Sequence, residues 1–138
     1  MSEREIVRVL DVMKHRFDMI SGSLTIREAL QTMEHVDAKC LIVEKRHEDD
    51  EIGILLISDI AHQVVGEGRS PDRVNAYEIM QKPVVGVHPN MDIRYCARLF
   101  ARFALARTPV IENDEVVGIV SYSDLVIKGL TGYGVGRD

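Results

Sequence analysis

The stretch GIVSYSDL, Gly118–Leu125, decides the fold, because a near copy of it, GILLISDI, stands at Gly53–Ile60. In both copies a glycine opens a run of β-type residues that ends at a Ser-Asp step. Repetition within a chain sets the size of its structural unit, so it has to be settled before local structure is predicted.

Two further blocks repeat in the same order at an offset of about 67 residues. VLDVMKHRFDMI, residues 9–20, parallels AYEIMQKPVVGV, residues 76–87, and AKCLIVE, residues 38–44, parallels ARTPVIE, residues 106–112. Three ordered matches indicate that the chain is one unit written twice.

The repeats set the predicted domain boundaries. We expect a first repeat over residues 5–66 and a second over 76–130, with a linker at 67–75 that is rich in Gly, Pro and charge. Residues 131–138 are glycine-rich and without periodicity, so we expect a flexible tail there.

Each repeat is predicted to run strand, helix, strand, strand, helix. Apolar residues recur at helical spacing in both repeats: Ile26, Ala29, Leu30, Met33 and Val36, and then Ile93, Cys96, Ala97, Phe100, Phe103 and Ala104. Two short apolar runs joined by a polar turn follow each helix, which predicts an antiparallel hairpin. A repeat of about 60 residues is marginal as an independent core. We therefore expect an α/β (α+β) fold of two β-α-β-β-α repeats packed with pseudo-twofold symmetry.

Composition excludes several functional classes. Hydrophobic residues make up 46% and charged residues 28%, as in soluble globular proteins, and no apolar run approaches a membrane span, so we expect a cytoplasmic protein. The net charge of -5 without a basic stripe disfavours nucleic acid. The histidines and cysteines lack metal-ligand spacing, and no nucleophile-base pair is visible, so we predict neither a metal site nor an enzyme. Cys40 and Cys96 are interpreted as buried thiols.

The ordered set of motifs resembles a tandem pair of cystathionine-β-synthase-type (CBS) domains from about Glu5 to Gly129. The residues that carry the resemblance are LDVM and YEIM, the T-x-x-E-A-L of Thr25–Leu30, the TPVI of Thr108–Ile111, and the two G-I-x-x-x-S-D steps. The resemblance implies a non-catalytic regulatory module with no required cofactor. Its ligand would be AMP, ADP, ATP, S-adenosylmethionine or a nicotinamide nucleotide, bound in the cleft between the repeats. It would act in trans on an unidentified protein partner.

The family pattern G-h-x-T/S-x-x-D is matched by Ser121 and Asp124. The resemblance implies that the aspartate accepts from the ribose hydroxyls, which suits an acceptor-only carboxylate. It also places a ligand against Lys82, Pro83, Val84, Val85, Thr108 and Pro109, with Arg107 as a candidate cation for a phosphate. However, S-x-x-D before a helix is also a capping pattern. The two interpretations are compatible, and the repeat architecture favours the ligand for Asp124.

The first repeat departs from this pattern, because Leu56 stands where Ser121 stands in the second. Asp59 is retained, and Ser58 could cap the helix instead, so we predict a weaker second site formed by Asp59, Ser58, Arg16 and Phe17. A decayed site would also fit an alternative function, a dimeric scaffold that needs no ligand. The helix face with Tyr95, Leu99 and Phe103 is the candidate surface for a homodimer.

Overall fold

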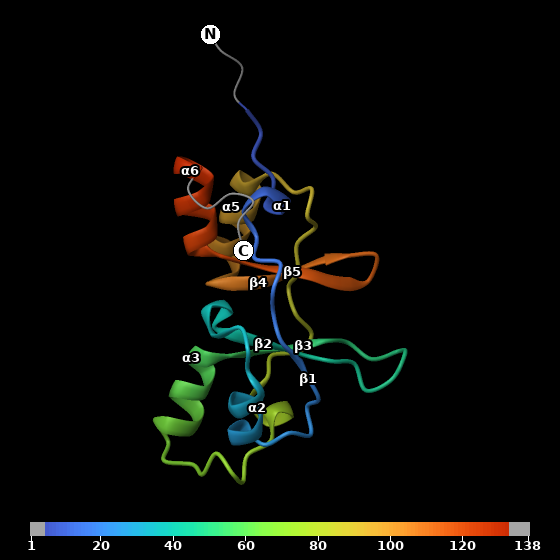
Figure 1. Ribbon diagram of the computed structural model, residues 1–138, viewed down its shortest axis with the longest axis vertical. Coiled ribbons are helices and arrows are strands. Elements are labelled where there is room, and N and C mark those ends of the chain that lie inside the picture. The colour runs from blue at the N-terminus through green and yellow to red at the C-terminus, as the bar shows by residue number, and fades with distance from the viewer. Residues whose placement is uncertain (1–4, 133–138) are drawn as a thin grey trace. The chain divides into compact units, whose positions relative to one another are not determined.

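The computed structural model describes residues 5–132 of the chain, which form two compact units. Phe17–Val84 forms one of them, which we call the continuous unit. The described residues up to Arg16 and from Val85 onward form the other, the discontinuous unit. The chain therefore crosses between the units twice, as the colour ramp of Figure 1 shows.

The continuous unit contains a three-stranded sheet in the order β1-β2-β3. Its elements are β1 (Met19–Ile20), α2 (Ile26–Thr32), the 3₁₀ turn η1 (Val36–Ala38), β2 (Cys40–Val43), β3 (Gly53–Leu56), α3 (Ile57–Ile60), the π-helical turn η2 (Ala61–Val65) and α4 (Ala76–Ile79). Strand β1 runs parallel to β2, and β2 pairs antiparallel with β3, which confirms the predicted hairpin. The helix predicted to reach Val36 is shorter, because it ends at Thr32 and Val36 begins η1.

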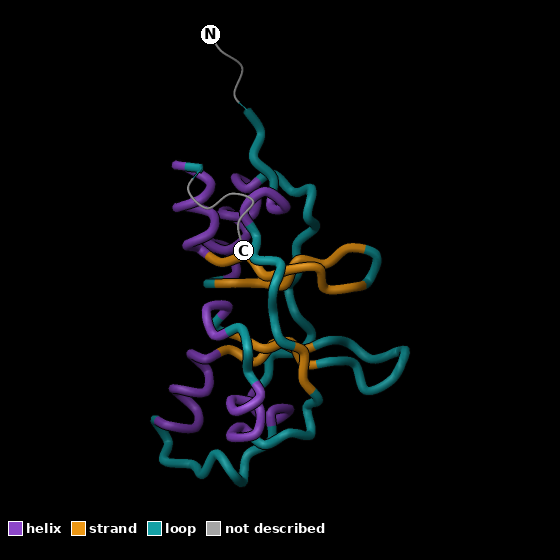
Figure 2. Tube along the Cα trace, in the orientation of Figure 1, coloured by secondary structure: helices purple, strands orange, loops and turns teal. Residues whose placement is uncertain are grey.

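The discontinuous unit holds α1 (Val9–Val12), α5 (Ile93–Phe103), β4 (Arg107–Glu112), β5 (Glu115–Ser121), the π-helical turn η3 (Asp124–Lys128) and α6 (Gly129–Thr131). Strands β4 and β5 form the second predicted hairpin. Its turn residues Asn113 and Asp114 have positive φ angles of 52° and 65°, the geometry of a tight two-residue hairpin turn. Figure 2 shows strand along this hairpin almost to its tip, whereas a long loop joins β2 to β3.

The strand predicted to open the second repeat is reduced to a single parallel bridge between Val87 and Val110. The Val87 N–H donates to the Pro109 carbonyl at 3.1 Å, and the Ile111 N–H donates to the Val87 carbonyl at 2.8 Å. Extending this ladder in either direction would need an N–H from Pro89 or Pro109, which proline lacks. The two prolines therefore limit the pairing to Val87.

Helices cover one side of each hairpin (Figure 1): α1, α5 and α6 in the discontinuous unit, and α2 and α3 in the continuous unit. Each unit has its own apolar core. In the continuous unit it includes Ile26, Leu41, Leu55, Val64 and Ile79, and in the discontinuous unit Val9, Val12, Phe100, Val110 and Val120. No helix within residues 5–132 has the length and apolar character needed to cross a membrane.

The cores show that the segments at the start of the two repeats are exchanged between the units. Val9 and Met13, from the start of the first repeat, pack in the discontinuous unit with Val110 and Val120 of the second. Helix α4, from the start of the second repeat, contributes its buried Ile79 to the continuous unit. Each compact unit is thus built from parts of both sequence repeats.

The acidic residue two positions before each repeated methionine is a helix cap. The Asp11 carboxylate accepts from the Arg8 N–H at 2.9 Å, and the Glu78 carboxylate accepts from the Asn75 N–H at 2.8 Å. These bonds satisfy backbone donors at the starts of α1 and α4, which have no partner within the helix.

The repeated methionine and the residue after it cross the hairpin at its glycine, and we call Met13–Lys14 and Met80–Gln81 the crossing segments. Lys14 and Ile119 exchange both backbone hydrogen bonds, at 2.8 and 2.9 Å, as do Gln81 and Ile54, both at 2.9 Å. A Cβ on Gly118 would lie 2.6 Å from the Lys14 carbonyl oxygen and 2.8 Å from Met13 Sδ. The glycine is therefore required by the close passage of the backbone.

We expect Gly118→Ala to lower the free energy of unfolding by about 2 kcal/mol, because its Cβ meets a backbone atom that cannot move aside. The matched variant is Gly53→Ala, whose nearest contact is the flexible Met80 Sδ at 2.7 Å, with the Gln81 carbonyl at 3.2 Å. In urea denaturation, Gly53→Ala should lower the free energy of unfolding by less than Gly118→Ala does. An equal or larger loss for Gly53→Ala would contradict the conclusion that the close passage of the backbone requires glycine at position 118.

Candidate functional site

Ser121 and Asp124 lie together at the end of β5, where the chain turns into its last helical segment. The Ser121 N–H and hydroxyl donate to Asp124 Oδ2 at 2.9 and 3.0 Å, and the Asp124 N–H donates to Ser121 Oγ at 3.4 Å. The pair therefore forms a reciprocal helix cap, as the spacing predicts. Its part in ligand binding stays a prediction.

Two lysines surround the Asp124 carboxylate. Lys14 Nζ donates to Oδ1 at 2.7 Å and to Oδ2 at 2.9 Å, and Lys128 Nζ lies 3.4 Å from Oδ1. The Asp124 side chain is only 3% exposed, whereas the lysine side chains are 17% and 16% exposed. The two ammonium groups and the Ser121 hydrogen bonds give the buried carboxylate partners for both of its oxygens. The side of this cluster that solvent reaches is therefore cationic.

Four other predicted site residues also belong to the discontinuous unit. Arg107 pairs with Ser121 in the β4–β5 ladder, so its backbone is adjacent to the cap. The Thr108 hydroxyl donates to the Val85 carbonyl, which lacks a backbone donor because the next residue on β4 is Pro109. Val85 is thereby fixed to the strand that pairs with Ser121.

The remaining residues predicted for this site, Lys82, Pro83 and Val84, belong to the continuous unit. Lys82 Nζ contacts the Asp50 carboxylate at 2.7 and 2.9 Å, in the loop between β2 and β3. The lysine, together with Arg46, holds the pKa of Asp50 far below its usual range. The cation of Lys82 is therefore engaged within its own unit.

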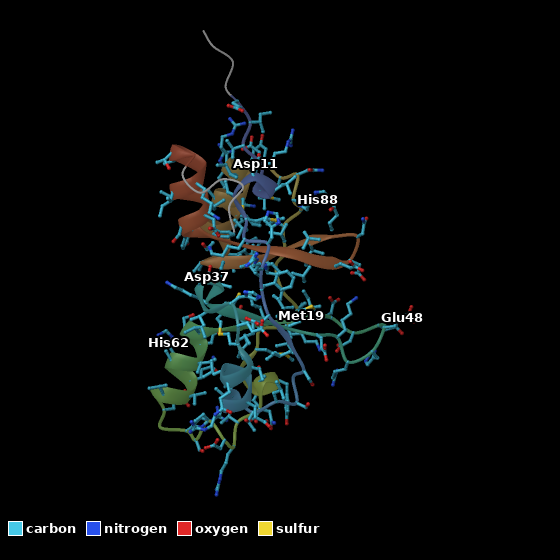
Figure 3. All side chains as sticks on the ribbon, viewed as in Figure 1. Asp11, Met19, Asp37, Glu48, His62 and His88 are labelled. Atoms are coloured by element: carbon cyan, nitrogen blue, oxygen red, sulfur yellow. The ribbon has the colours of Figure 1, made fainter. Side chains whose placement is uncertain are left out.

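The acidic run in the β2–β3 loop is exposed at its tip. Glu48 lies far out along that loop (Figure 3), and Glu48 and Asp49 are exposed. Within residues 5–132 no cluster of three His, Cys, Asp or Glu side chains could hold a metal ion. Cys40 and Cys96 are buried and unbridged, and burial raises the pKa of the Cys96 thiol to about 11.

Asp59, the aspartate of the predicted weaker site, has a different environment from Asp124. It accepts a hydrogen bond from the Gln81 amide at 2.9 Å. The proposed cap by Ser58 is wrong: α3 begins at Ile57 after Leu56, whose apolar side chain cannot accept, and Ser58 is exposed inside the helix. Arg16 and Phe17, also predicted here, fall on opposite sides of the unit boundary.

Sequence reasoning missed Lys14 and Lys128. Lys14 follows Met13 in the first repeated block and aligns with Gln81 in the second. This change from an amide to a cation at a repeated position was the sequence signal that could have identified it. Lys128 follows Asp124 by four residues, one helical turn, the spacing at which oppositely charged side chains meet. The pairing of Lys14 with Asp124 has no local signature, because 110 residues separate them.

The continuous unit also has a surface pocket of about 570 Å³. It is lined by Ser21, Gly22, Ser23, Val43, Glu44, Arg46, Tyr77, Met80 and Lys82. Lys82 is the one predicted site residue among them, so this pocket is not the Ser121–Asp124 cluster.

Comparison with known proteins identifies the two repeats. Residues 9–66 and 76–129 each match the family model of the CBS domain. An uncharacterised protein of Methanopyrus kandleri is 32% identical over 80% of this chain and 58% of its own length. The CBS domain-containing protein YhcV of Bacillus subtilis is 27% identical over 93% of this chain and 89% of its length.

Solved structures share the fold. The hexameric CBS-CP12 protein from bloom-forming cyanobacteria is 37% identical with a TM-score of 0.86, over 93% of this chain and 75% of that one. A CBS domain pair solved with 5-methylthioadenosine and S-adenosyl-L-methionine is 23% identical with a TM-score of 0.74, over 93% of this chain and 98% of that one. The predicted fold, a mixed α/β tandem repeat, is confirmed.

We expect Asp124→Asn to lower the free energy of unfolding by about 2–3 kcal/mol, because it leaves two partly buried ammonium groups without a counter-ion. Asp59→Asn is the matched control and should cost less than about 0.5 kcal/mol, since an amide there can still accept from Gln81. Urea denaturation of both variants checks this. Similar costs for the two would show that Asp124 has no special structural role.

Proposed function

Because the chain belongs to the CBS domain family, we propose that it is a regulatory module that binds an adenosine-containing ligand at the Ser121–Asp124 cluster. CBS pairs as a class are regulatory ligand-binding modules. On this proposal the module performs no catalysis, needs no cofactor, and passes the ligand signal to a protein partner.

The observation that carries the proposal is the group formed by Asp124 with Ser121, Lys14 and Lys128, which we call the Asp124 cluster. Its carboxylate is held in place by the Ser121 cap, while the lysines beside it keep donor capacity for a ligand. The site-forming residues Lys14 and Val85 come from distant parts of the sequence but belong to one unit. A CBS pair of the same fold holds 5-methylthioadenosine and S-adenosyl-L-methionine, which supports an adenosine moiety as the common ligand element.

Regulation would act at the two places where the chain passes from one unit to the other, after Arg16 and after Val84. Val85 is the first residue of the discontinuous unit after the second passage, and Lys14 lies two residues before Arg16, where the first passage begins. A ligand that contacts both residues is therefore close in sequence to both passages. It would shift a conformational equilibrium by the difference in its affinity for the two states, and so change the surface that a partner meets.

One observation favours a second candidate, a self-associating scaffold that needs no ligand. Tyr95 and Phe103 on α5 are 56% and 51% exposed and, with the half-buried Leu99, form an apolar row along one helix face. The cyanobacterial relative is hexameric. Asp124 also has a full structural role without a ligand, which this alternative requires.

The test is thermal unfolding of nucleotide-free protein with AMP, ADP, ATP, S-adenosylmethionine, NAD or NADH. A ligand at about 100 times its Kd adds about 2.7 kcal/mol of stability, which is easily seen as a higher midpoint. We expect a shift with at least one compound, lost in Asp124→Asn and kept in Asp59→Asn, each compared with its own ligand-free midpoint. Absence of any shift, with the protein folded, would favour the scaffold.

A further inference from the structure

The two units place different residues at matching positions around their aspartates. Lys14 and Gln81 are matched by structure, because each exchanges two backbone hydrogen bonds with the residue after the hairpin glycine. Each side chain then contacts the aspartate of its own unit: Lys14 contacts Asp124 at 2.7 Å, and Gln81 contacts Asp59 at 2.9 Å. The same architecture therefore carries a cation in one unit and a neutral amide in the other.

The second cation shows the same replacement. Lys128 follows Asp124 by four residues, and Gln63 follows Asp59 by four. Two ammonium groups and one carboxylate leave one net positive charge in the Asp124 cluster. Gln81 contacts Asp59 and Gln63 holds the position that matches Lys128, so neither matching position supplies a cation to Asp59. Arg107 and Lys39, which match in the aligned repeats, are both cationic and so do not alter this difference.

The positive charge in the Asp124 cluster is accessible, and the negative charge is not. The carboxylate side chain is 3% exposed and is covered by the Ser121 cap and by Lys14. The two lysine side chains reach solvent, and an ammonium group has three donors, of which Lys14 uses two on Asp124. An approaching ligand therefore meets cations first.

We infer that the Asp124 cluster selects adenosine compounds that carry phosphate groups over neutral adenosine compounds and over the sulfonium of S-adenosylmethionine. This rests on the proposed function. The lysines attract the phosphate and repel the sulfonium, and partial burial strengthens both effects relative to water. Because these two positions hold amides in the continuous unit, the surroundings of Asp59 are less suited to a phosphate.

The experiment measures the binding of ADP, 5-methylthioadenosine and S-adenosylmethionine to the full chain by titration calorimetry at low salt. The variants are Lys14→Gln, which copies the continuous unit, and Lys128→Gln, which tests the second cation. Gln81 already makes this contact with Asp59, so a glutamine fits at position 14. The matched control is Gln81→Lys, which adds a cation at the other aspartate.

We expect ADP to bind wild type at least about tenfold more tightly than 5-methylthioadenosine, as one close charge pair implies. Lys14→Gln and Lys128→Gln should each lower the affinity for ADP about tenfold and change the affinity for 5-methylthioadenosine by less than about twofold. Added salt should lower the affinity for ADP more than that for the neutral compound. Gln81→Lys should leave ADP affinity at the Asp124 site unchanged.

Two results would overturn the inference in distinguishable ways. If 5-methylthioadenosine binds as tightly as ADP, or if the lysine variants weaken both equally, the cluster binds adenosine without selecting for phosphate. If no adenosine compound binds to folded wild type, the proposed function fails and the inference fails with it.

Discussion

The structure depends on one kind of close backbone contact, made once in each unit. There a crossing segment passes over the hairpin at the hairpin's glycine. At Gly118 the Lys14 carbonyl lies where a Cβ would clash, and Lys14 and Ile119 bond to each other through both backbone groups. The equivalent contact joins Gln81 to Ile54. These contacts attach the start of each sequence repeat to the unit that holds the other repeat's hairpin, so neither core is complete without the exchange.

The same passage builds the candidate site. Two backbone hydrogen bonds hold Lys14 against Ile119, which lies two residues before Ser121 in β5. The Lys14 side chain therefore reaches Asp124. The position after the repeated methionine thus decides the charge beside each aspartate. Lysine in one unit and glutamine in the other give the two aspartates neighbours of different charge at matching backbone positions.

Much of the fold could be predicted from local patterns, because hairpins, helix periodicity and caps leave short-range signatures. The Ser121–Asp124 cap and the β4–β5 hairpin belong to this class. The exchange between the units could not be predicted, since a repeat shows which segments are alike and not which ones pack together. The contact of Lys14 with Asp124 spans 110 residues and depends on that exchange. The supposed cap by Ser58 failed because helix α3 begins before it.

The most direct test of the central claim, that a ligand is held where a crossing segment meets the Asp124 cluster, is hydrogen exchange of the full chain with and without saturating ADP. We predict slower exchange in peptides covering Lys14 and residues 119–128, with much smaller changes in those covering residues 54–65 and Gln81. Slower exchange concentrated around Asp59, or none at either place, would contradict it.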